Sequence, residues 1–296
     1  MGELGRAITD ESSKLPMKVQ FLSATEAIEL IPDEATVGLI GGGGGLLEAT
    51  LLHHHVEKRF LASGHPKKLT CVHALGIGDR KERGLNRFAH EGLVQRVIGG
   101  HWVWSPRMQQ LAKDNKIEAY VLPGGVIMQL MREVAAKRPG LITHVGLGTF
   151  VDPTLGGGKM NQAAQEDLVE RIEIDGMTYL RYLPIQVNVA LLKGSKADEE
   201  GNISLDEEPA NVDIYAMAAA AHNSGGKVIF QVREKVRKGE LGARQVRVPS
   251  ALVDVVVVDP DQRQGYELIY DPSISGEQKD AKYQSEKPAF SVRLAI

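Results

Sequence analysis

Five consecutive glycines, at residues 41–45, are the part of this sequence whose type and spacing most clearly suggest chemistry. They follow a short apolar run at 36–40 that predicts a buried strand, and they precede residues 46–62, where apolar side chains recur at helical spacing. A glycine turn between a strand and a helix leaves backbone N–H groups free at the positive end of the helix dipole. Such a turn suits a phosphate or a developing oxyanion, so we predict a pocket for an anion or a carbonyl oxygen here.

This glycine run matches neither common phosphate-binding fingerprint. No Gly-Lys-Ser/Thr follows it, which excludes a P-loop, and a dinucleotide-binding match that starts at Gly41 has Leu46 in place of its last glycine. The alternative is a tight turn that only lets the helix pack close to the strand. Glu48 is open to two interpretations, a first-turn carboxylate that favours the helix dipole or a carboxylate facing the pocket.

Other reactive side chains do not form a recognisable site. His53, His54 and His55 are consecutive, and consecutive helical residues point about 100° apart, so the three cannot share a face, and we predict no metal site. No G-x-S-x-G elbow is present, and Cys71 lies in an apolar run where we expect it to be buried. The segment His101-Trp102-Val103-Trp104, together with Arg107, forms a buried aromatic cluster, an amphipathic wall or a subunit contact.

Strand, glycine turn and helix alternate along most of the chain, which predicts a parallel, helix-covered sheet. Further strands are predicted at 68–75, 118–122, 141–145, 227–232 and 252–258, and further helices at 126–137 and 210–222. Asp175-Gly176 lies between two apolar runs and predicts a hairpin, while runs at 187–193 and 203–205 flank a polar loop and suggest a second antiparallel excursion. The predicted fold class is therefore α/β, with a doubly wound, mainly parallel sheet, helices on both faces and an antiparallel insertion.

Length and composition limit the function classes. The chain has 296 residues, 43% hydrophobic and 25% charged, which suits one large α/β domain or two small ones. A net charge of -3 offers no overall attraction for nucleic acid or an anionic membrane. Residues 1–17 lack the apolar core of a signal peptide, and no window approaches the ~20 apolar residues of a membrane span. We expect a cytoplasmic protein with a polar N-terminal extension at 1–18, a domain at 19–260, and a polar C-terminal tail or linker at 261–296, its stretch 278–287 exposed.

Several segments together resemble the first half of the family I CoA-transferases, especially the acetate and propionate branch. They are collinear from about residue 19 to about residue 275. The matching stretches are residues 31–36 (IPDEAT), the glycine run through 46–50 (LLEAT), 76–80 (GIGDR), 99–102 (GGHW), 146–153 (GLGTFVDP), 221–226 (AHNSGG) and 252–260.

The resemblance implies a CoA-transferase-like fold and a ping-pong reaction through a glutamyl-CoA thioester. It implies no metal and no cofactor, with coenzyme A acting as a substrate. In this family the nucleophilic glutamate belongs to the second half of a fused chain or to a separate β subunit. Glu91, which is followed by a glycine, aligns with a first-half segment and is not the nucleophile. We expect no catalytic residue in this chain, a partner β subunit in a hetero-oligomer, and no activity of the chain alone.

The resemblance also implies an acyl-CoA and carboxylate pocket. Its expected residues are Gly42, Gly43, Gly44, Glu48, Gly124, Gly125, Gln129, Gly148 and Thr149. One departure concerns Gly124, because the family commonly has Pro-Gln-Gly where this chain has Pro-Gly-Gly, and losing an oxyanion donor can cost about 100- to 1000-fold in rate. Either a backbone amide or Gln129 replaces the lost donor, or the pocket takes a larger acyl group, or the activity differs. The rival functions are an acyl-CoA hydrolase or ring-opening enzyme on the same fold, and a non-catalytic binding or scaffold protein derived from a transferase half.

Overall fold

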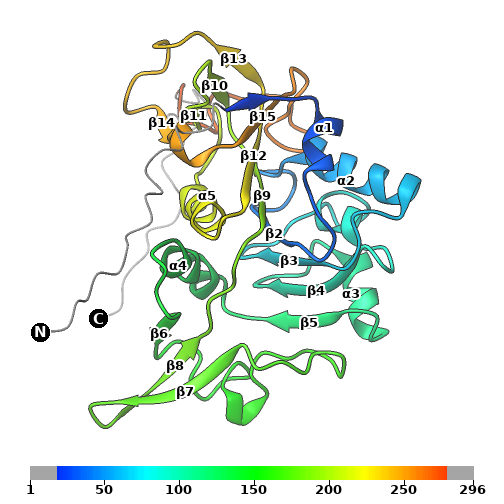
Figure 1. Ribbon diagram of the computed structural model, residues 1–296, viewed down its shortest axis with the longest axis vertical. Coiled ribbons are helices and arrows are strands. Elements are labelled where there is room, and N and C mark those ends of the chain that lie inside the picture. The colour runs from blue at the N-terminus through cyan, green and yellow to red at the C-terminus, as the bar shows by residue number, and fades with distance from the viewer. Residues whose placement is uncertain (1–18, 279–296) are drawn as a thin grey trace, which may run out of the picture.

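A computed structural model describes residues 19–278 of the chain, and its centre is an eight-stranded sheet in the order β1-β15-β12-β9-β2-β3-β4-β5 (Figure 1). Its strands are β1 (Gln20–Phe21), β2 (Thr36–Leu39), β3 (Leu69–His73), β4 (Val94–Gly99), β5 (Glu118–Val121), β9 (Val189–Lys193), β12 (Lys227–Val232) and β15 (Val255–Val258). Each neighbouring pair in this sheet is parallel. The predicted parallel sheet is confirmed, and its strands are apolar and β-branched because helices cover both faces.

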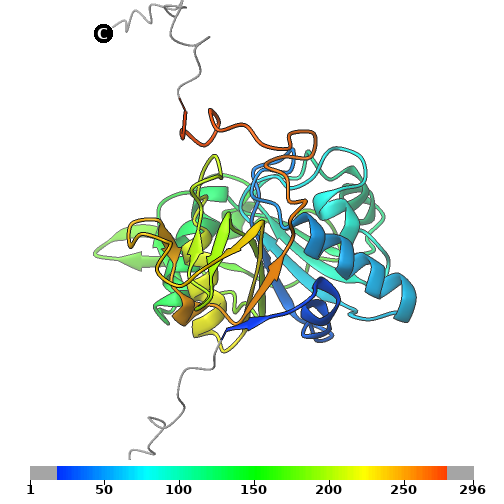
Figure 2. The ribbon, with the colours of Figure 1, turned by 90° about the horizontal axis from the view of Figure 1, so that it is seen from above.

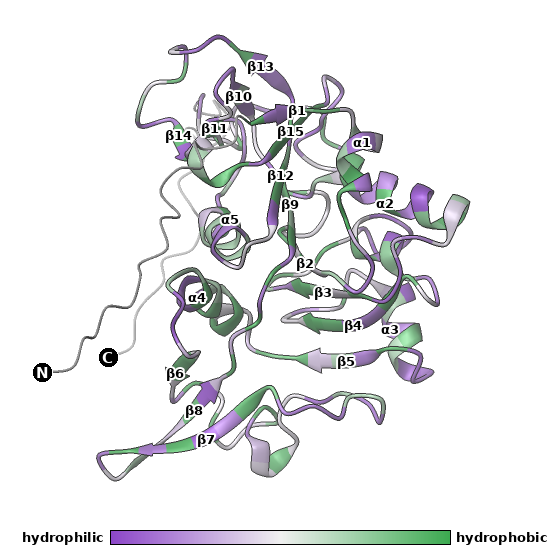
Figure 3. Cartoon of the chain, viewed as in Figure 1, coloured by the Kyte–Doolittle hydropathy of each residue, from purple (hydrophilic) through white to green (hydrophobic). Residues whose placement is uncertain are grey.

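Two groups of helices cover the two faces of the sheet, as Figure 2 shows from above. One face carries α1 (Ala24–Glu29), α2 (Thr50–Ser63) and α3 (Pro106–Lys113), and the other carries α4 (Gly124–Ala135) and α5 (Ile214–Asn223). Short 3-10 turns lie at η1 (Gly84–Phe88), η2 (Pro153–Leu155) and η3 (Ser250–Leu252). Buried hydrophobic residues cluster on both faces of the sheet, where these helices cover it, and much of the sheet is coloured as hydrophobic in Figure 3, which confirms the doubly wound arrangement.

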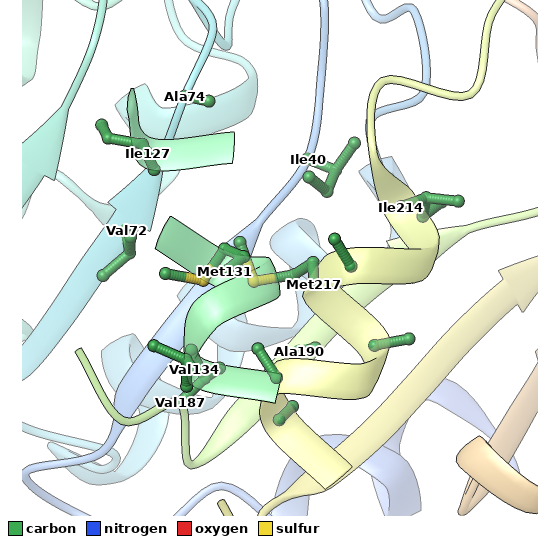
Figure 4. Close-up of a cluster of buried hydrophobic side chains, with 14 of the residues drawn as sticks. Ile40, Val72, Ala74, Ile127, Met131, Val134, Val187, Ala190, Ile214 and Met217 are labelled. Atoms are coloured by element: carbon green, nitrogen blue, oxygen red, sulfur yellow. The ribbon is translucent and has the colours of Figure 1, made fainter. Parts of the chain in front are cut away.

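The α4–α5 layer packs closely onto the middle of the sheet. Met131 of α4 and Met217 of α5 meet between the two helices (Figure 4). Met217 also rests on Gly38 of β2, where a Cβ atom would lie 2.3 Å from the methionine Sδ. The consecutive alanines of α5, residues 218–221, let this helix approach the strands because their side chains are small.

A three-stranded antiparallel sheet lies at one end of the molecule, drawn at the bottom of Figure 1. It pairs β6 (Leu141–Thr143) with β8 (Met177–Tyr182), and β8 with β7 (Val169–Ile174). Asp175 and Gly176 have φ of 52° and 75°, so the predicted hairpin is confirmed. The strand expected at 141–145 does not extend the parallel sheet, because it pairs with β8 instead.

The second antiparallel excursion also differs from its prediction. The run at 187–193 forms β9 in the middle of the parallel sheet, so it does not pair with residues 203–205. The excursion instead joins β10 (Lys196–Asp198) to β11 (Ile203–Ser204), and β13 (Glu234–Val236) and β14 (Val246–Val248) complete a four-stranded sheet. Its β10 and β13 are parallel, while the other two pairs are antiparallel.

The segment after β15 packs against the domain. Gln262, Gln264 and Tyr266 are nearly completely buried, although the polar composition from residue 261 onward suggested a tail or linker. This expectation is corrected for these residues, because they fill their hydrogen bonds inside the domain rather than with water. The predicted N-terminal extension at 1–18 and nearly all of the stretch expected to be exposed at 278–287 lie outside the described residues. Among residues 19–278, no helix is long and apolar enough to cross a membrane.

Candidate acyl-transfer site

The topology of the parallel sheet marks one place for a ligand. From β2 the chain moves outward through β3, β4 and β5, whereas from β9 it moves the other way through β12 and β15. β2 and β9 are neighbours, so the direction of winding reverses between them. In open α/β sheets, ligands bind outside the carboxyl ends of the strands at such a reversal. The glycine run follows Leu39 at the end of β2, so the fold places it at this point.

The glycine turn does not lead directly into a helix. Helix α2 begins only at Thr50, and residues Gly43, Gly44 and Gly45 have φ of 81°, 65° and 90°. Leu47 also has a positive φ, of 56°. Side chains other than glycine rarely adopt these conformations, which explains why the run is glycine. The prediction of amides aligned with a helix dipole is therefore wrong.

Most amides of the turn already have acceptors inside the protein. Gly42 donates to the Leu46 carbonyl at 2.9 Å, and Gly44 donates to the Gly78 carbonyl at 3.0 Å. The Gly45 amide donates to Glu48 Oε1 at 3.3 Å. Within residues 19–278 the Gly43 N–H meets no acceptor. The Gly41 N–H meets none there either, and both residues are buried, so the turn offers a narrower site than its composition suggested.

Glu48 is completely buried beneath this turn. Its Oε1 accepts from the amides of Gly45 and Gly78, and its Oε2 accepts from the Tyr266 hydroxyl. Burial raises the pKa of Glu48 to about 7, against the opposing effect of these donors and of the Lys193 charge. The first-turn interpretation is wrong because α2 begins after Glu48. Its carboxylate holds the turn and Tyr266 together from within.

Lys193, at the end of β9, forms a second buried polar centre beside Glu48. Its ammonium group lies 3.1 Å from Glu208 Oε2 and donates to the Arg263 carbonyl at 2.7 Å. Burial lowers the pKa of Lys193 and raises that of Glu208, while the ion pair opposes both shifts. The backbone N–H of Tyr266 donates to the Gly44 carbonyl at 2.8 Å. The segment 262–266 therefore lies across the carboxyl ends of β9 and β2.

The sequence analysis did not identify Lys193 or Tyr266 as site residues. Lys193 is a single charged residue at the end of an apolar strand, and that position could have indicated a buried polar site. Tyr266 lay in the segment assigned to the polar tail, and no local pattern links it to Glu48, 218 residues earlier.

Glycines at the carboxyl ends of the strands, from the glycine turn to the start of α4, lie in close contact with their neighbours. A Cβ at Gly43 would lie 2.8 Å from the Trp104 ring, and the same ring approaches Gly76. Further along the sheet edge, Gly100 lies against both the Ala74 carbonyl and Gly124. These contacts form one surface at the carboxyl ends of β2, β3, β4 and β5, called the glycine edge below.

The structure gives a steric reason for the missing glutamine at Gly124. A Cβ there would lie 2.7 Å from the Ala74 carbonyl oxygen, so a side chain requires the backbone to move. Gly125 is exposed, with no atom within 4 Å of its Cβ position. Gln129 is also exposed, one turn further along α4.

Gly148 and Thr149 lie in the exposed loop after β6. The Gly148 amide donates to Asp152 Oδ2 at 3.0 Å, and the Thr149 hydroxyl donates to the Gly146 carbonyl at 2.8 Å. No hydrogen bond joins them to the glycine turn in the described part of the chain. Their expected place in the pocket stays a prediction.

The three consecutive histidines point to different surroundings, as helix geometry requires. His53 is buried against the edge of Phe88, His54 lies 3.1 Å from an Arg87 nitrogen, and His55 Nδ1 lies 3.0 Å from the Leu51 carbonyl. Residues 19–278 contain no cluster of three or more His, Cys, Asp or Glu side chains placed to hold a metal. Cys71 is buried, as expected.

The aromatic segment 101–104 is partly buried and partly exposed. Trp102 and Trp104 are half-buried, while Val103 and His101 are exposed. Arg80 lies over the Trp104 ring, with its guanidinium carbon 4.7 Å from the ring centre. The segment is thus an amphipathic wall beside the glycine edge rather than a fully buried cluster.

Comparison with known proteins decides the family. Residues 21–259 match the family model described as Coenzyme A transferase. The chain belongs to the Coenzyme A transferase family. The resemblance inferred from its motifs is therefore confirmed, and so is the CoA-transferase fold.

The relatives that match this chain are of two lengths. The acetate CoA-transferase YdiF of Escherichia coli K12 is 44% identical over 249 residues, which cover 84% of this chain and 47% of YdiF. One subunit of the 3-oxoadipate CoA-transferase of Acinetobacter baylyi is 30% identical over 242 residues, which cover 79% of this chain and 91% of that subunit. The chain thus spans about half the length of the first relative and most of the second.

A solved structure matches the architecture closely. It is the acyl-CoA transferase YdiF of E. coli O157:H7 in a thioester complex with CoA, with a TM-score of 0.87 and 43% identity. The match covers 89% of this chain and 54% of that one. The layers described above are therefore those of one half of a CoA-transferase.

The structure places Glu91 far from the glycine edge of this CoA-transferase fold. Glu91 precedes β4 and so lies at the amino end of that strand, whereas the glycine edge lies at the carboxyl ends. Its side chain is exposed and lies 3.2 Å from Lys116. This position agrees with its exclusion as the nucleophile.

Proposed function

We propose that this chain is the α subunit of a heteromeric CoA-transferase, which moves coenzyme A between an acyl-CoA and a carboxylate. A separate β subunit supplies the nucleophilic glutamate, and the chain alone is inactive. The match to nearly the full length of one 3-oxoadipate CoA-transferase subunit supports the heteromeric arrangement. The cytoplasmic location expected from the sequence belongs to the same proposal.

One observation carries this proposal: the glycine turn lies at the winding reversal of the sheet and leaves the Gly43 N–H without an acceptor among the described residues. Attack on a thioester carbonyl places negative charge on its oxygen, and a fixed backbone donor stabilises that charge. The donor is already oriented, because neighbouring amides and the Trp104 ring hold the turn. The turn therefore suits the carbonyl oxygen of an acyl group in transit.

Glu48 and Glu267 lie near the turn, and neither suits the nucleophile. Glu48 is enclosed, and three donors already occupy its carboxylate. Glu267 lines a cavity of about 380 Å³ with Gly44, but its side chain is 87% exposed and lies 3.1 Å from Arg83. A carboxylate nucleophile gains reactivity where water is excluded, so we assign the attack to a partner residue that closes over the turn.

The proposed reaction is balanced without any cofactor. The partner's glutamate attacks the thioester carbonyl, which forms an acyl-glutamyl anhydride and releases CoA thiolate. The thiolate attacks the glutamyl carbonyl, which forms a glutamyl-CoA thioester and frees the first carboxylate. The acceptor carboxylate then attacks the glutamyl-CoA thioester, which forms a second acyl-glutamyl anhydride and releases CoA thiolate. This thiolate attacks the acyl carbonyl of the second anhydride. The second acyl-CoA forms, and the glutamate returns to its carboxylate state.

Mass spectrometry after incubation with an acyl-CoA tests where the intermediate forms. The complex of this chain with its β subunit is treated with acyl-CoA and no acceptor, reduced with borohydride, and digested. We expect the modified glutamate on the β subunit, and the same result from a complex carrying Glu267→Gln in this chain. Modification of Glu48 or Glu267 would overturn the assignment. Free acid formed at the catalytic rate without acceptor would instead favour an acyl-CoA hydrolase.

A further inference from the structure

Residues 262–268, called the strap below, form one wall of the cavity beside the glycine turn. The cavity has a volume of about 380 Å³, and its lining includes Gly44 and Leu46 on the turn side together with residues 265–268 of the strap. The loops after β3 and β4 supply the rest of the lining, through Asp79, Lys81 and Trp104. A group bound beside Gly44 therefore lies against the strap as well.

The strap touches the glycine turn directly. The Tyr266 amide donates to the Gly44 carbonyl at 2.8 Å. A Cβ at Gly45 would lie 2.5 Å from the Tyr266 nitrogen, so only a glycine allows this approach. The position of the strap and the shape of the turn are thus linked.

Two buried side chains anchor the strap. Lys193 donates to the carbonyls of Arg263 and Gln264, at 2.7 Å and 3.3 Å. The Tyr266 hydroxyl donates to Glu48 Oε2, and Glu48 Oε1 accepts from the amides of Gly45 and Gly78, at 3.3 Å and 3.0 Å. One carboxylate therefore joins the Tyr266 hydroxyl to the glycine turn and to the loop after β3.

The hydrogen bonds around Glu48 fit its ionised form. A carboxylate accepts all three donors, whereas a protonated carboxyl group carries its own O–H and accepts them more weakly. Burial raises the pKa of Glu48 to about 7, and the Tyr266 hydroxyl opposes that rise. Within the described residues, the charged groups that act on this network are Lys193 on Glu48, Asp79 and Arg83 on Tyr266, and Glu208 and Asp259 on Lys193.

We propose that Tyr266 is a positioning residue of the acyl-transfer site, whose hydroxyl group holds the glycine turn in its reactive shape through the Glu48 carboxylate. This inference rests on the proposed transferase function. The hydroxyl acts through Glu48, which is completely buried, rather than on the thioester itself. Small displacements of positioned groups reduce rates steeply, so removing this hydroxyl should lower kcat by about 10- to 100-fold.

The test measures CoA transfer by the complex of this chain with its β subunit, between about pH 5 and about pH 9. The variants are Tyr266→Phe, Glu48→Gln and the two combined, and phenylalanine keeps the ring while removing only the hydroxyl group. Tyr179→Phe, in β8, makes the same change away from the glycine edge and is the matched control. We expect Tyr266→Phe to lower kcat while the KM for acyl-CoA changes by less than about 3-fold, and the control to change neither.

The pH profile separates positioning from a merely structural role. In the unmodified complex, kcat should rise with pH as Glu48 ionises. Tyr266→Phe should move this rise to higher pH, because the lost hydrogen bond favoured the carboxylate. Glu48→Gln should abolish the rise, and Tyr266→Phe should then lower kcat by less than about 3-fold further, because the two residues act through one contact.

Different failures point to different errors. An unchanged kcat in Tyr266→Phe, or a lower kcat with the pH profile of the unmodified complex, would overturn the positioning role and leave the transferase function standing. Loss of β-subunit binding by Tyr266→Phe in size-exclusion chromatography would also overturn it, because the hydroxyl would then serve assembly. Absence of transfer by the unmodified complex at every pH would overturn the transferase function itself.

Discussion

Replacing Glu48 by glutamine is expected to remove a pH-dependent cost of folding. Burial raises the pKa of this carboxyl group from its ordinary 4.5 to about 7. Between these values the unfolded chain has released the proton while the folded chain still holds it, so the free energy of unfolding falls as pH rises. The difference corresponds to about 3 kcal/mol, lost between about pH 4.5 and about pH 7. Glutamine has nearly the same shape and never ionises, so the variant should not show this loss.

Urea denaturation of both proteins at about pH 5 and about pH 8 measures the effect. The unmodified chain should lose about 3 kcal/mol relative to Glu48→Gln between the two conditions. Asp79 and Arg83, which act on Tyr266, are present in both proteins. Lys193 is coupled to Glu48, because each charge favours the charged form of the other, so the comparison measures Glu48 together with its effect on Lys193. Glu173→Gln, at an exposed site in β7, is the control for the change from carboxylate to amide. A stability difference between unmodified chain and Glu48→Gln that is the same at both pH values would refute the argument.

Two further perturbations test the packing of the site. Gly124→Ala should destabilise the chain by about 1–3 kcal/mol, because its Cβ would press on the Ala74 carbonyl, whereas Gly125→Ala has open space and should be neutral or stabilise by up to about 1 kcal/mol. Equal urea midpoints for the two variants would contradict the crowding at the glycine edge. Lys193→Met should cost about 3–5 kcal/mol by leaving Glu208 buried without its ion-pair partner, and a second change, Glu208→Gln, should recover much of that loss in thermal denaturation. A double variant no more stable than the single one would show that the pair is not coupled.

Local patterns sufficed to predict the parallel class of the sheet, most of its strands and the hairpin. Strands β2, β3, β12 and β15 are short apolar runs, whereas β1 and β4 carry polar residues and were not predicted, and Asp175-Gly176 supplies the positive φ values that a tight hairpin turn requires. The family followed from an ordered set of such segments and their glycines. These features depend on neighbours in the sequence, so the sequence alone reveals them.

The interior of the site depends on partners distant in the chain, and no local pattern reveals those. Glu48 meets Tyr266 across 218 residues, and Lys193 meets the Arg263 carbonyl across 70. The start of α2 was misplaced because residues 46–49 keep helical spacing of apolar side chains, while Leu47 adopts a left-handed conformation. Tertiary contacts that fix the glycine turn override the local preference for helix there.

A CoA-transfer assay of this chain with and without its β subunit tests whether the nucleophile belongs to the partner. Acyl-CoA and an isotopically labelled acceptor carboxylate are incubated with each preparation, and labelled acyl-CoA is measured. We expect labelled product only from the complex, with no loss of acyl-CoA when the acceptor is omitted. Labelled acyl-CoA formed by the chain alone would contradict the assignment of the nucleophile to a partner.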